Sequence, residues 1–175
     1  MNRILIYFVL VQVFLLGFLL RFIYERLKLA RRIDTRNTLI FSLIFTAMML
    51  IWASWFVMSP LDPWRFDLPG VIRWSGMAAF ILGLILVFGA LLKLKSVENI
   101  EFLATTGIFS RIRHPMYLGF ILWILGWAVY NGAIFSLIPG SVGIANILYW
   151  RSLEEAEMKA LYGETYTAYS NRTWF

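Results

Sequence analysis

The only histidine of the chain lies in a polar segment that separates two apolar runs. Residues 105–119 read Thr-Thr-Gly-Ile-Phe-Ser-Arg-Ile-Arg-His-Pro-Met-Tyr-Leu-Gly, which places Arg111 and Arg113 just before His114. An imidazole exchanges protons near neutral pH, and a guanidinium binds carboxylates and phosphates. In so apolar a chain, such a segment lies at a membrane surface or lines a cavity, because lipid cannot satisfy its charges or its backbone. We therefore expect the chemistry of the protein here.

A helix is expected to begin at Pro115, because proline is favoured at the first helical position, where no hydrogen-bond donor is needed. The free N–H groups and the positive dipole end of that helix, beside Arg113, would bind a carboxylate or a phosphate. Gly107 and Gly119 would permit close approach of the backbone on either side. The alternative interpretation is a basic interfacial loop whose histidine reaches towards water.

A second polar cluster, residues 151–169, follows the last apolar run and contains the adjacent carboxylates Glu154 and Glu155. If the preceding helix continues into this cluster, a carboxylate lies above small and aromatic residues on one side of it. That stripe, at 100° per residue, consists of Gly143, Ile147, Trp150 and Glu154. It could line a groove shared by a lipid and a cofactor.

The end of this second cluster is rich in tyrosine. Gly163 is expected to stop the helix, and Tyr162, Tyr166 and Tyr169 would then form an aromatic wall. The simpler alternative is that Glu155 pairs with a lysine one turn later on the helix surface and that the tyrosines form an interfacial belt.

The composition of the chain indicates an integral membrane protein. Of its 175 residues, 61% are hydrophobic, 18% aromatic and only 15% charged, which exceeds what a soluble domain carries. This length predicts one membrane domain, residues 1–175, whose active site must be assembled from helix ends and short loops. There is no cysteine and one histidine, so we expect no metal site.

Apolar runs predict an all-α polytopic protein with about five transmembrane helices and a cytoplasmic C-terminal helix. The last two helices form a hairpin at Asn131-Gly132, a strong turn signal, and the first of them barely spans. The first run is expected to be a retained helix, because it lacks a small-residue cleavage site. The residues 59–70, rich in proline, are expected to form an irregular interfacial loop. The predicted apolar segments are residues 4–20, 39–58, 71–92 and the interrupted run 116–150.

Basic residues gather on one side of these segments, and cytoplasmic loops retain positive charge. We therefore expect the N-terminus outside, the C-terminus and the cofactor site in the cytoplasm, and a prokaryotic inner membrane as the location. Attraction to membrane lipids explains the net charge of +6 without a nucleic-acid partner. No charge falls near the middle of a span, which argues against a transporter. The cytoplasmic side carries Arg21, Arg26, Lys28, Arg31, Arg32, Arg36, Lys93, Lys95, Arg111, Arg113, Arg151, Lys159 and Arg172, and the other side carries Arg3, Arg65 and Arg73.

Taken together, the two clusters resemble the superfamily of isoprenylcysteine carboxyl methyltransferases and phospholipid methyltransferases. The first matching element is Thr106-Gly107-Ile108-Phe109, followed by Arg113-His114-Pro115-Met116-Tyr117-Leu118-Gly119. The second is Glu154-Glu155, then Leu161-Tyr162-Gly163, Tyr166 and Tyr169. Two ordered motifs separated by a membrane hairpin are far more specific than Arg-His-Pro alone. The resemblance covers residues 103–169 approximately, which it implies are the catalytic region, and the first three spans match only in hydropathy and orientation.

The resemblance implies a methyltransferase that binds S-adenosyl-L-methionine between the two clusters. Its carboxylate would suit Arg113 and the helix start, its ribose Glu154 or Glu155, and its sulfonium a tyrosine or tryptophan face. The residues implied to be catalytic are His114, Glu154 and Arg113. Those implied to bind the cofactor are Gly107, Arg113, His114, Pro115, Tyr117, Gly119, Glu154, Glu155, Tyr162 and Tyr166.

The acceptor implied by the resemblance is a lipid-like or prenylated molecule that enters from the bilayer. A carboxylate or thiolate acceptor needs no general base, whereas a phospholipid amine would need His114 or Glu154 as the base. Which acceptor is used stays open, and so does the oligomeric state.

Two further function classes stay open beside the methyltransferase. Steroid 5-alpha-reductase-like enzymes, which use NADPH, share a similar Arg-His-Pro region. This chain departs from that pattern with Met116 where asparagine is expected and Phe120 after Gly119. A non-catalytic membrane protein of the same fold is the third class.

Overall fold

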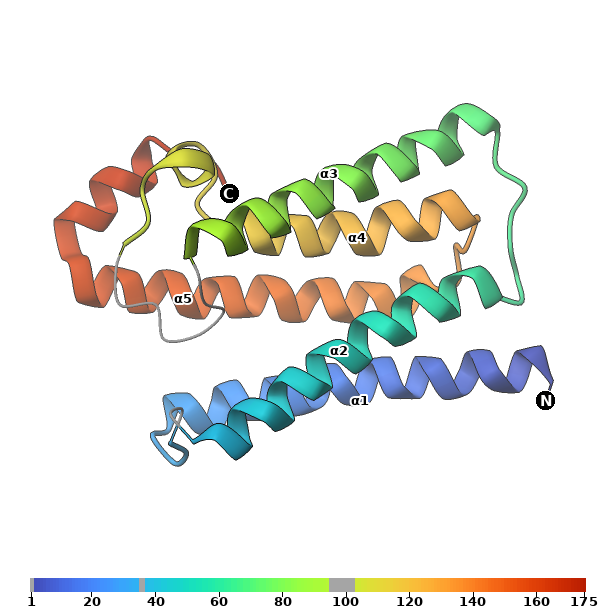
Figure 1. Ribbon diagram of the computed structural model, residues 1–175, viewed down its shortest axis with the longest axis horizontal. Coiled ribbons are helices and arrows are strands. Elements are labelled where there is room, and N and C mark those ends of the chain that lie inside the picture. The colour runs from blue at the N-terminus through green and yellow to red at the C-terminus, as the bar shows by residue number, and fades with distance from the viewer. Residues whose placement is uncertain (1, 35–36, 95–102) are drawn as a thin grey trace.

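The chain is all-helical in the computed structural model, which describes residues 2–34, 37–94 and 103–175 (Figure 1). Five long helices lie roughly along one axis, and a short 3-10 helix, η1, precedes the fourth. Their bounds are α1 Arg3–Leu29, α2 Thr38–Leu61, α3 Gly70–Leu94, η1 Gly107–Ser110, α4 Pro115–Asn131 and α5 Leu137–Asn171. The predicted helical fold is confirmed.

Three of the described helices, α1, α2 and α3, are long and apolar enough to cross a membrane. Asparagine side chains define where the first two begin: Asn2 accepts from the Ile4 N–H, and Asn37 accepts from Leu39 and Ile40. At 17 residues, α4 is apolar but shorter, as predicted for the first arm of the hairpin. That α4 and α5 complete five crossings stays a prediction.

The predicted hairpin turn between α4 and α5 is confirmed. α4 ends at Asn131, and Gly132 adopts a left-handed conformation with φ of 67°. A Cβ atom at Gly132 would also collide with the backbone carbonyl oxygen of Phe66. There is no room for a side chain at this position. Both the turn and the close approach therefore require glycine.

The loop predicted at residues 59–70 is shorter than expected, because α2 continues through Pro60 to Leu61. A proline leaves the carbonyl four residues earlier without its helical partner. That carbonyl, on Phe56, instead accepts a hydrogen bond of 3.1 Å from the Trp127 indole. The Pro60 carbonyl in turn accepts from Arg3 and Arg65. These tertiary partners allow the last turn to stay helical, so the prediction of a loop starting at residue 59 was wrong by one turn.

The most extensive packing joins α3 to α4, and glycines on both helices make it possible. A Cβ atom at Gly119 would lie 2.7 Å from the Gly83 carbonyl, and one at Gly76 would lie 2.8 Å from the Gly126 carbonyl. Close backbone contact through small residues is the usual way in which membrane helices associate. Gly119, predicted to bind the cofactor, thus faces α3.

An aromatic core joins α1, α2 and α5 below the polar end of the bundle. Phe14 packs on Trp55, and Phe18 stacks on Trp150 at a ring separation of 5.6 Å. Gly143 faces Phe14 and Phe18, and Ile147 and Trp150 are buried. The predicted stripe on α5 is therefore the face that packs against α1, and it leads directly to Glu154.

The two ends of the bundle differ in charge as predicted. The end of α1, the start of α2, the end of α3 and the start of α4 lie at one end of the molecule, and the α2–α3 loop and the α4–α5 turn at the other (Figure 1). All the basic residues assigned to the first end lie there, except Arg36 and Lys95, which are outside the described residues.

Candidate functional site

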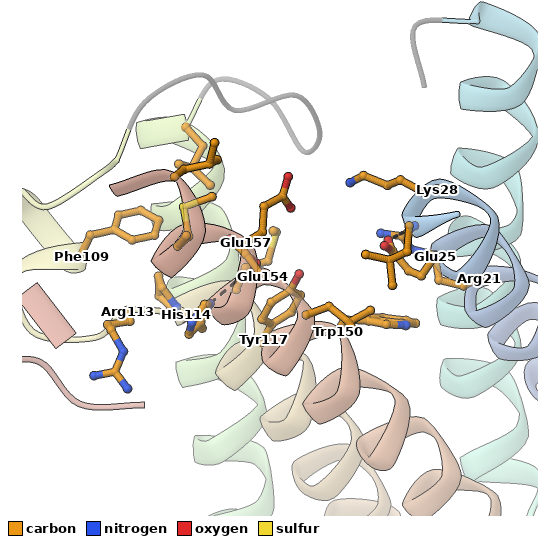
Figure 2. A pocket seen from close by; sticks show the side chains of 17 residues that line it. Arg21, Glu25, Lys28, Phe109, Arg113, His114, Tyr117, Trp150, Glu154 and Glu157 are labelled. Carbon is orange, nitrogen blue, oxygen red and sulfur yellow. Dashed lines mark ion pairs between the residues drawn. The ribbon is translucent and has the colours of Figure 1, made fainter. Parts of the chain in front are cut away.

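A cavity of about 320 Å³ opens at the basic end of the bundle, among α1, α3, α4 and α5 (Figure 2). This volume lies in the range of roughly 300–1,000 Å³ typical of small-molecule sites. Its polar and aromatic lining comes from three helix ends and from the segment before α4. These residues are Arg21, Glu25 and Lys28 of α1, Phe109 of η1, Arg113, His114 and Tyr117 around the start of α4, and Trp150, Glu154 and Glu157 of α5.

His114 lies at the start of α4 and is buried between two carboxylates. It is the N-cap residue, and Pro115 takes the first helical position as predicted. Its Nε2 atom lies 3.0 Å from Glu155 Oε1, and its Nδ1 atom lies 3.7 Å from Glu154 Oε2. A carboxylate can only accept, so in the neutral ring the Nε2–H donates to Glu155. The lone pair of Nδ1 is then left on the Glu154 side of the ring.

Burial determines the protonation of this histidine. It lowers the pKa of His114, and this effect outweighs the opposite influence of Glu154 and Glu155. For Glu155, burial alone would raise the pKa, but the hydrogen bonds from His114 and Arg113 lower it overall. At neutral pH the pair is therefore a neutral imidazole hydrogen-bonded to an ionised carboxylate.

Arg113 holds the C-terminal tail. Its Nε donates to Glu155 at 3.1 Å, and its NH1 donates to the carbonyls of Ser170 at 2.8 Å and Thr173 at 2.6 Å. Figure 2 shows its guanidinium on the side of His114 opposite to the α1 residues of the cavity. Arg113 was predicted to bind the cofactor carboxylate. That assignment stays a prediction, and these contacts give the side chain a structural role.

The C-terminal tail folds back over the site because α5 is broken at Gly163. There φ is 52° and ψ is −123°, a conformation that strongly favours glycine. Beyond the break, the Tyr169 hydroxyl donates to the Phe109 carbonyl of η1 at 2.6 Å. The backbone N–H groups of Arg113 and His114 donate to the carbonyls of Trp174 and Phe175. Gly163 therefore interrupts the helix as predicted, but a second helical segment follows it and continues to Asn171.

A smaller cavity of about 60 Å³ lies between η1 and this tail. It shares His114 and Glu154 with the larger cavity and is also lined by Tyr166 and Tyr169. Tyr166 is 2% exposed, and its hydroxyl has no hydrogen-bond partner among the described residues. Burial, reinforced by the charge of Glu155, raises the pKa of Tyr166 to about 12. Its hydroxyl is therefore a neutral group available to a ligand.

The predicted site residues fall into three groups. His114, Pro115, Tyr117 and Glu154 line the larger cavity, and Tyr166 lines the smaller one. Arg113, which also lines both cavities, and Glu155 hold the tail and the imidazole in place. Gly107, Gly119 and Tyr162 lie elsewhere: Gly107 begins η1 with φ of 66°, Gly119 packs on α3, and Tyr162 lines neither cavity.

Sequence reasoning missed the contribution of α1 to the cavity. Arg21, Glu25 and Lys28 line it, although the sequence offered them only as basic or acidic residues after an apolar run. Their spacing of four and then three residues places them on one face of a helix. A charged face that directly continues an apolar span was the available signal.

Comparison with known proteins finds one matching protein family and similarity to two methyltransferases. The family model of the NnrU protein matches residues 6–172. The chain is 32% identical over 71 residues to protein-S-isoprenylcysteine O-methyltransferase of Schizosaccharomyces pombe, covering 40% of this chain and 30% of that protein. It is 31% identical over 86 residues to protein-S-isoprenylcysteine O-methyltransferase B of Arabidopsis thaliana, covering 49% and 43% respectively.

The chain thus spans less than half the length of either curated relative. No solved structure matches it significantly. The similarity to isoprenylcysteine O-methyltransferases agrees with the resemblance of the two motifs. Because the family model covers nearly the whole sequence, the chain belongs to the NnrU protein family.

Proposed function

We propose that the protein transfers a methyl group from S-adenosylmethionine to a lipid-like acceptor in the membrane, as an isoprenylcysteine carboxyl methyltransferase-like enzyme. One observation carries the proposal: His114 and Glu154, from the two separate motifs, lie together on a cavity at the end of a membrane bundle. The names of the two curated relatives support methyl transfer.

The lining of the cavities suits such a cofactor. Glu154 offers carboxylate oxygens to ribose hydroxyls, and the unpartnered Tyr166 hydroxyl could bond to a base or sugar. The Trp150 ring already stacks on Phe18 and carries the Arg21 guanidinium at 5.2 Å. The ring of Tyr117 stacks on His114 at 5.6 Å, and its hydroxyl points into the cavity (Figure 2). We propose that the other face of this ring meets the cation. We infer that the adenosine end lies on the α4–α5 side.

The chemistry needs little beyond positioning. When bound, the cofactor supplies a methyl group on a sulfonium, whose carbon a nucleophile attacks in line while the sulfur leaves as a neutral thioether. The folded-back tail and η1 cover His114, so that reactants held beside it would be kept from water. Fixing the nucleophile and the methyl group in line can supply most of the acceleration. For a carboxylate acceptor, Glu154 and His114 would bind and orient rather than transfer a proton.

An amine acceptor, as in phospholipid N-methylation, is the second candidate, and one observation favours it. The neutral His114 ring donates from Nε2 to Glu155, which leaves Nδ1 as a proton acceptor next to Glu154. An ammonium headgroup must lose a proton before it attacks, and Nδ1 could take it. Parallel assays with a prenylcysteine carboxylate and with a phosphatidylethanolamine acceptor, both with labelled cofactor, separate the two candidates.

The acceptor would reach the site from the bilayer. An apolar groove of about 330 Å³ lies between α1 and α5, lined by Leu15, Phe18, Phe22 and Tyr149 among others. Phe18 also stacks on Trp150, which lines the main cavity. The stacked rings of Phe18 and Trp150 therefore separate the groove from the cavity. If the apolar chain of an acceptor lies in the groove, its head group would pass these two rings to reach the cavity. In this arrangement the basic end of the bundle faces the cytoplasm, with the N-terminus outside.

Calorimetry on the protein in nanodiscs tests the proposal most directly. We expect S-adenosylhomocysteine to bind and NADPH not to bind. Binding of NADPH alone would replace the methyltransferase by a reductase. Binding of neither compound would favour a non-catalytic membrane protein.

A further inference from the structure

One face of α1 presents three charged side chains to the cavity: Arg21, Glu25 and Lys28. The helix continues past the apolar span, so that this face lies opposite Glu154 and Glu157 of α5 (Figure 2). Glu25 is only 8% exposed. Charged groups held inside a membrane bundle are costly unless they are paired, and they usually serve a function.

Two of the three side chains are already coupled. Arg21 NH1 lies 2.6 Å from Glu25 Oε1, and the Arg21 guanidinium stacks over the rings of Tyr24 and Trp150. These contacts fix Arg21 and hold Glu25 at the wall of the cavity. Lys28, in contrast, has no ion-pair or hydrogen-bond partner within the part of the chain that the structure describes. Figure 2 shows its ammonium extending towards the cavity.

The cation expected from the sequence at this site is engaged elsewhere. Nε and NH1 of Arg113 donate to Glu155, Ser170 and Thr173, and the backbone N–H of His114 donates to the Phe175 carbonyl. Of the cations that line the cavity, Arg113 lies beyond His114, whereas Arg21 and Lys28 of α1 lie across the cavity from α5 (Figure 2). Across the cavity, the α5 wall carries the carboxylates Glu154 and Glu157. A ligand with an anionic end and a hydroxylated end would thus lie with its anion towards α1.

We propose that this face of α1 binds the amino-acid end of the cofactor, an inference that rests on the function proposed above. Lys28 pairs with the α-carboxylate, and Glu25, held by Arg21, accepts a hydrogen bond from the α-ammonium. The adenosine end then lies towards Glu154 and the tail. In this arrangement the first transmembrane helix, which lies outside the two matching motifs, completes the cofactor site.

Two ligands separate this contact from the rest of the site. S-adenosylhomocysteine carries the amino-acid end, and 5′-methylthioadenosine lacks it. Calorimetry on nanodisc-embedded protein would measure both ligands with the wild type, Lys28→Ala and Glu25→Gln. Lys93→Ala is the matched control, because Lys93 is an exposed lysine near the end of α3 that lines none of the described cavities.

We expect Lys28→Ala and Glu25→Gln each to weaken S-adenosylhomocysteine binding about tenfold or more, as the loss of one charge-assisted contact does. Binding of 5′-methylthioadenosine should stay within about twofold of the wild type, and Lys93→Ala should change neither. Glu25→Gln leaves Arg21 beside a neutral amide, so its melting temperature is measured as well. The Lys28 variant removes no hydrogen bond or ion pair found among the described residues, so it remains informative if the Glu25 variant fails to fold.

The alternative outcomes overturn the inference in distinguishable ways. If Lys28→Ala weakens the binding of both ligands equally, or of neither ligand, the amino-acid end of the cofactor does not lie on α1, while the methyltransferase proposal stands. If the Lys28 effect appears only in nanodiscs with anionic lipid, this lysine binds lipid phosphate. If the wild type binds no S-adenosylhomocysteine at all, the proposed function fails, and this inference fails with it.

Discussion

The imidazole of His114 donates from Nε2 to Glu155 across 3.0 Å and thereby joins the two motifs of the chain. The next carboxylate back along α5, Glu154, lies on the Nδ1 side of the same ring and lines both cavities. Adjacent glutamates on one helix point about 100° apart, so the pair divides its work. Glu155 fixes the ring and the tail, and Glu154, which bonds to the Tyr117 side chain at the cavity wall, is the carboxylate that we propose to bind a ligand.

Replacing each glutamate separately tests this division. Glu154→Gln should weaken S-adenosylhomocysteine binding about tenfold with little change in melting temperature, because a charge-assisted contact to the ligand is lost. Glu155→Gln should lower the stability by about 1–3 kcal/mol, because His114 and Arg113 lose a shared carboxylate. Calorimetry and thermal unfolding in detergent measure the two effects. Equal effects of the two variants on both properties would contradict the division.

The lowered pKa of His114 predicts that the fold loses stability in mild acid. At a pH above the ordinary pKa of histidine, the ring is neutral in both the folded and the unfolded chain, and the contribution of His114 to the free energy of unfolding is fully present. As the pH falls below that range, the unfolded chain takes up a proton first, so stability decreases by up to about 1.4 kcal/mol per pH unit until the folded pKa is reached. The lowered pKa of Glu155 adds a similar loss at more acidic pH.

Melting temperatures measured between about pH 8 and pH 5 check this expectation, with His114→Gln as the comparison. The variant should be nearly flat through the histidine range, where the wild type declines. A melting temperature that rises on acidification would mean that the imidazolium is stabilised between its two carboxylates. The assignment of a free lone pair to Nδ1 would then be wrong.

Sequence periodicity and turn signals were enough to predict the helices and the hairpin. The length of an apolar run can be compared directly with the thickness of a bilayer. The Asn131-Gly132 turn follows from the backbone conformation that a glycine permits. Both depend only on residues that are close together in the sequence. Pro60 shows where this fails. Its helical conformation depends on Trp127, far away in sequence, which takes the place of the lost partner of Phe56. No local pattern contains that contact.

The site was predictable in part for the same reason. His114, Glu154 and Tyr166 belong to ordered motifs that a hairpin brings together, and the structure places them on adjoining cavities. The role of Arg113 was not predictable, because it depends on where the tail returns after Gly163. The spacing of Lys28 and its neighbours indicates a charged face on α1, but which cavity that face lines depends on how α1 packs against α5.

Gly163→Ala should separate the tail from the site without disturbing the helices. A Cβ atom there would meet nothing within 4 Å, so the cost is conformational, about 1–3 kcal/mol at φ of 52° and ψ of −123°. We expect weaker S-adenosylhomocysteine binding and faster proteolysis after residue 163. Gly70→Ala is the control, because Gly70 also has open space but lies in the first turn of α3 without a positive φ. If both variants behave alike, the break at Gly163 is not what holds the tail in place.

Removal of the unpartnered Tyr166 hydroxyl should affect the stability of the protein and its affinity for a ligand in opposite directions. In the unliganded protein, this buried group has no hydrogen-bond partner among the described residues, and such a group costs about 1–3 kcal/mol. Tyr166→Phe should therefore raise the melting temperature or leave it unchanged. If a ligand supplies the missing partner, the same variant should bind S-adenosylhomocysteine about three- to tenfold more weakly, as the loss of one neutral hydrogen bond predicts.

Tyr169→Phe is the matched control, because the Tyr169 hydroxyl already donates to the Phe109 carbonyl at 2.6 Å. Its removal should lower the melting temperature, since the Phe109 carbonyl loses its donor, and should affect binding only through that loss. Thermal unfolding with and without S-adenosylhomocysteine measures both properties in one experiment. A Tyr166→Phe protein that is less stable without ligand would show that the hydroxyl has a partner in the folded chain. The smaller cavity would then be a packing defect, and the cofactor would have to lie wholly between Glu154 and α1.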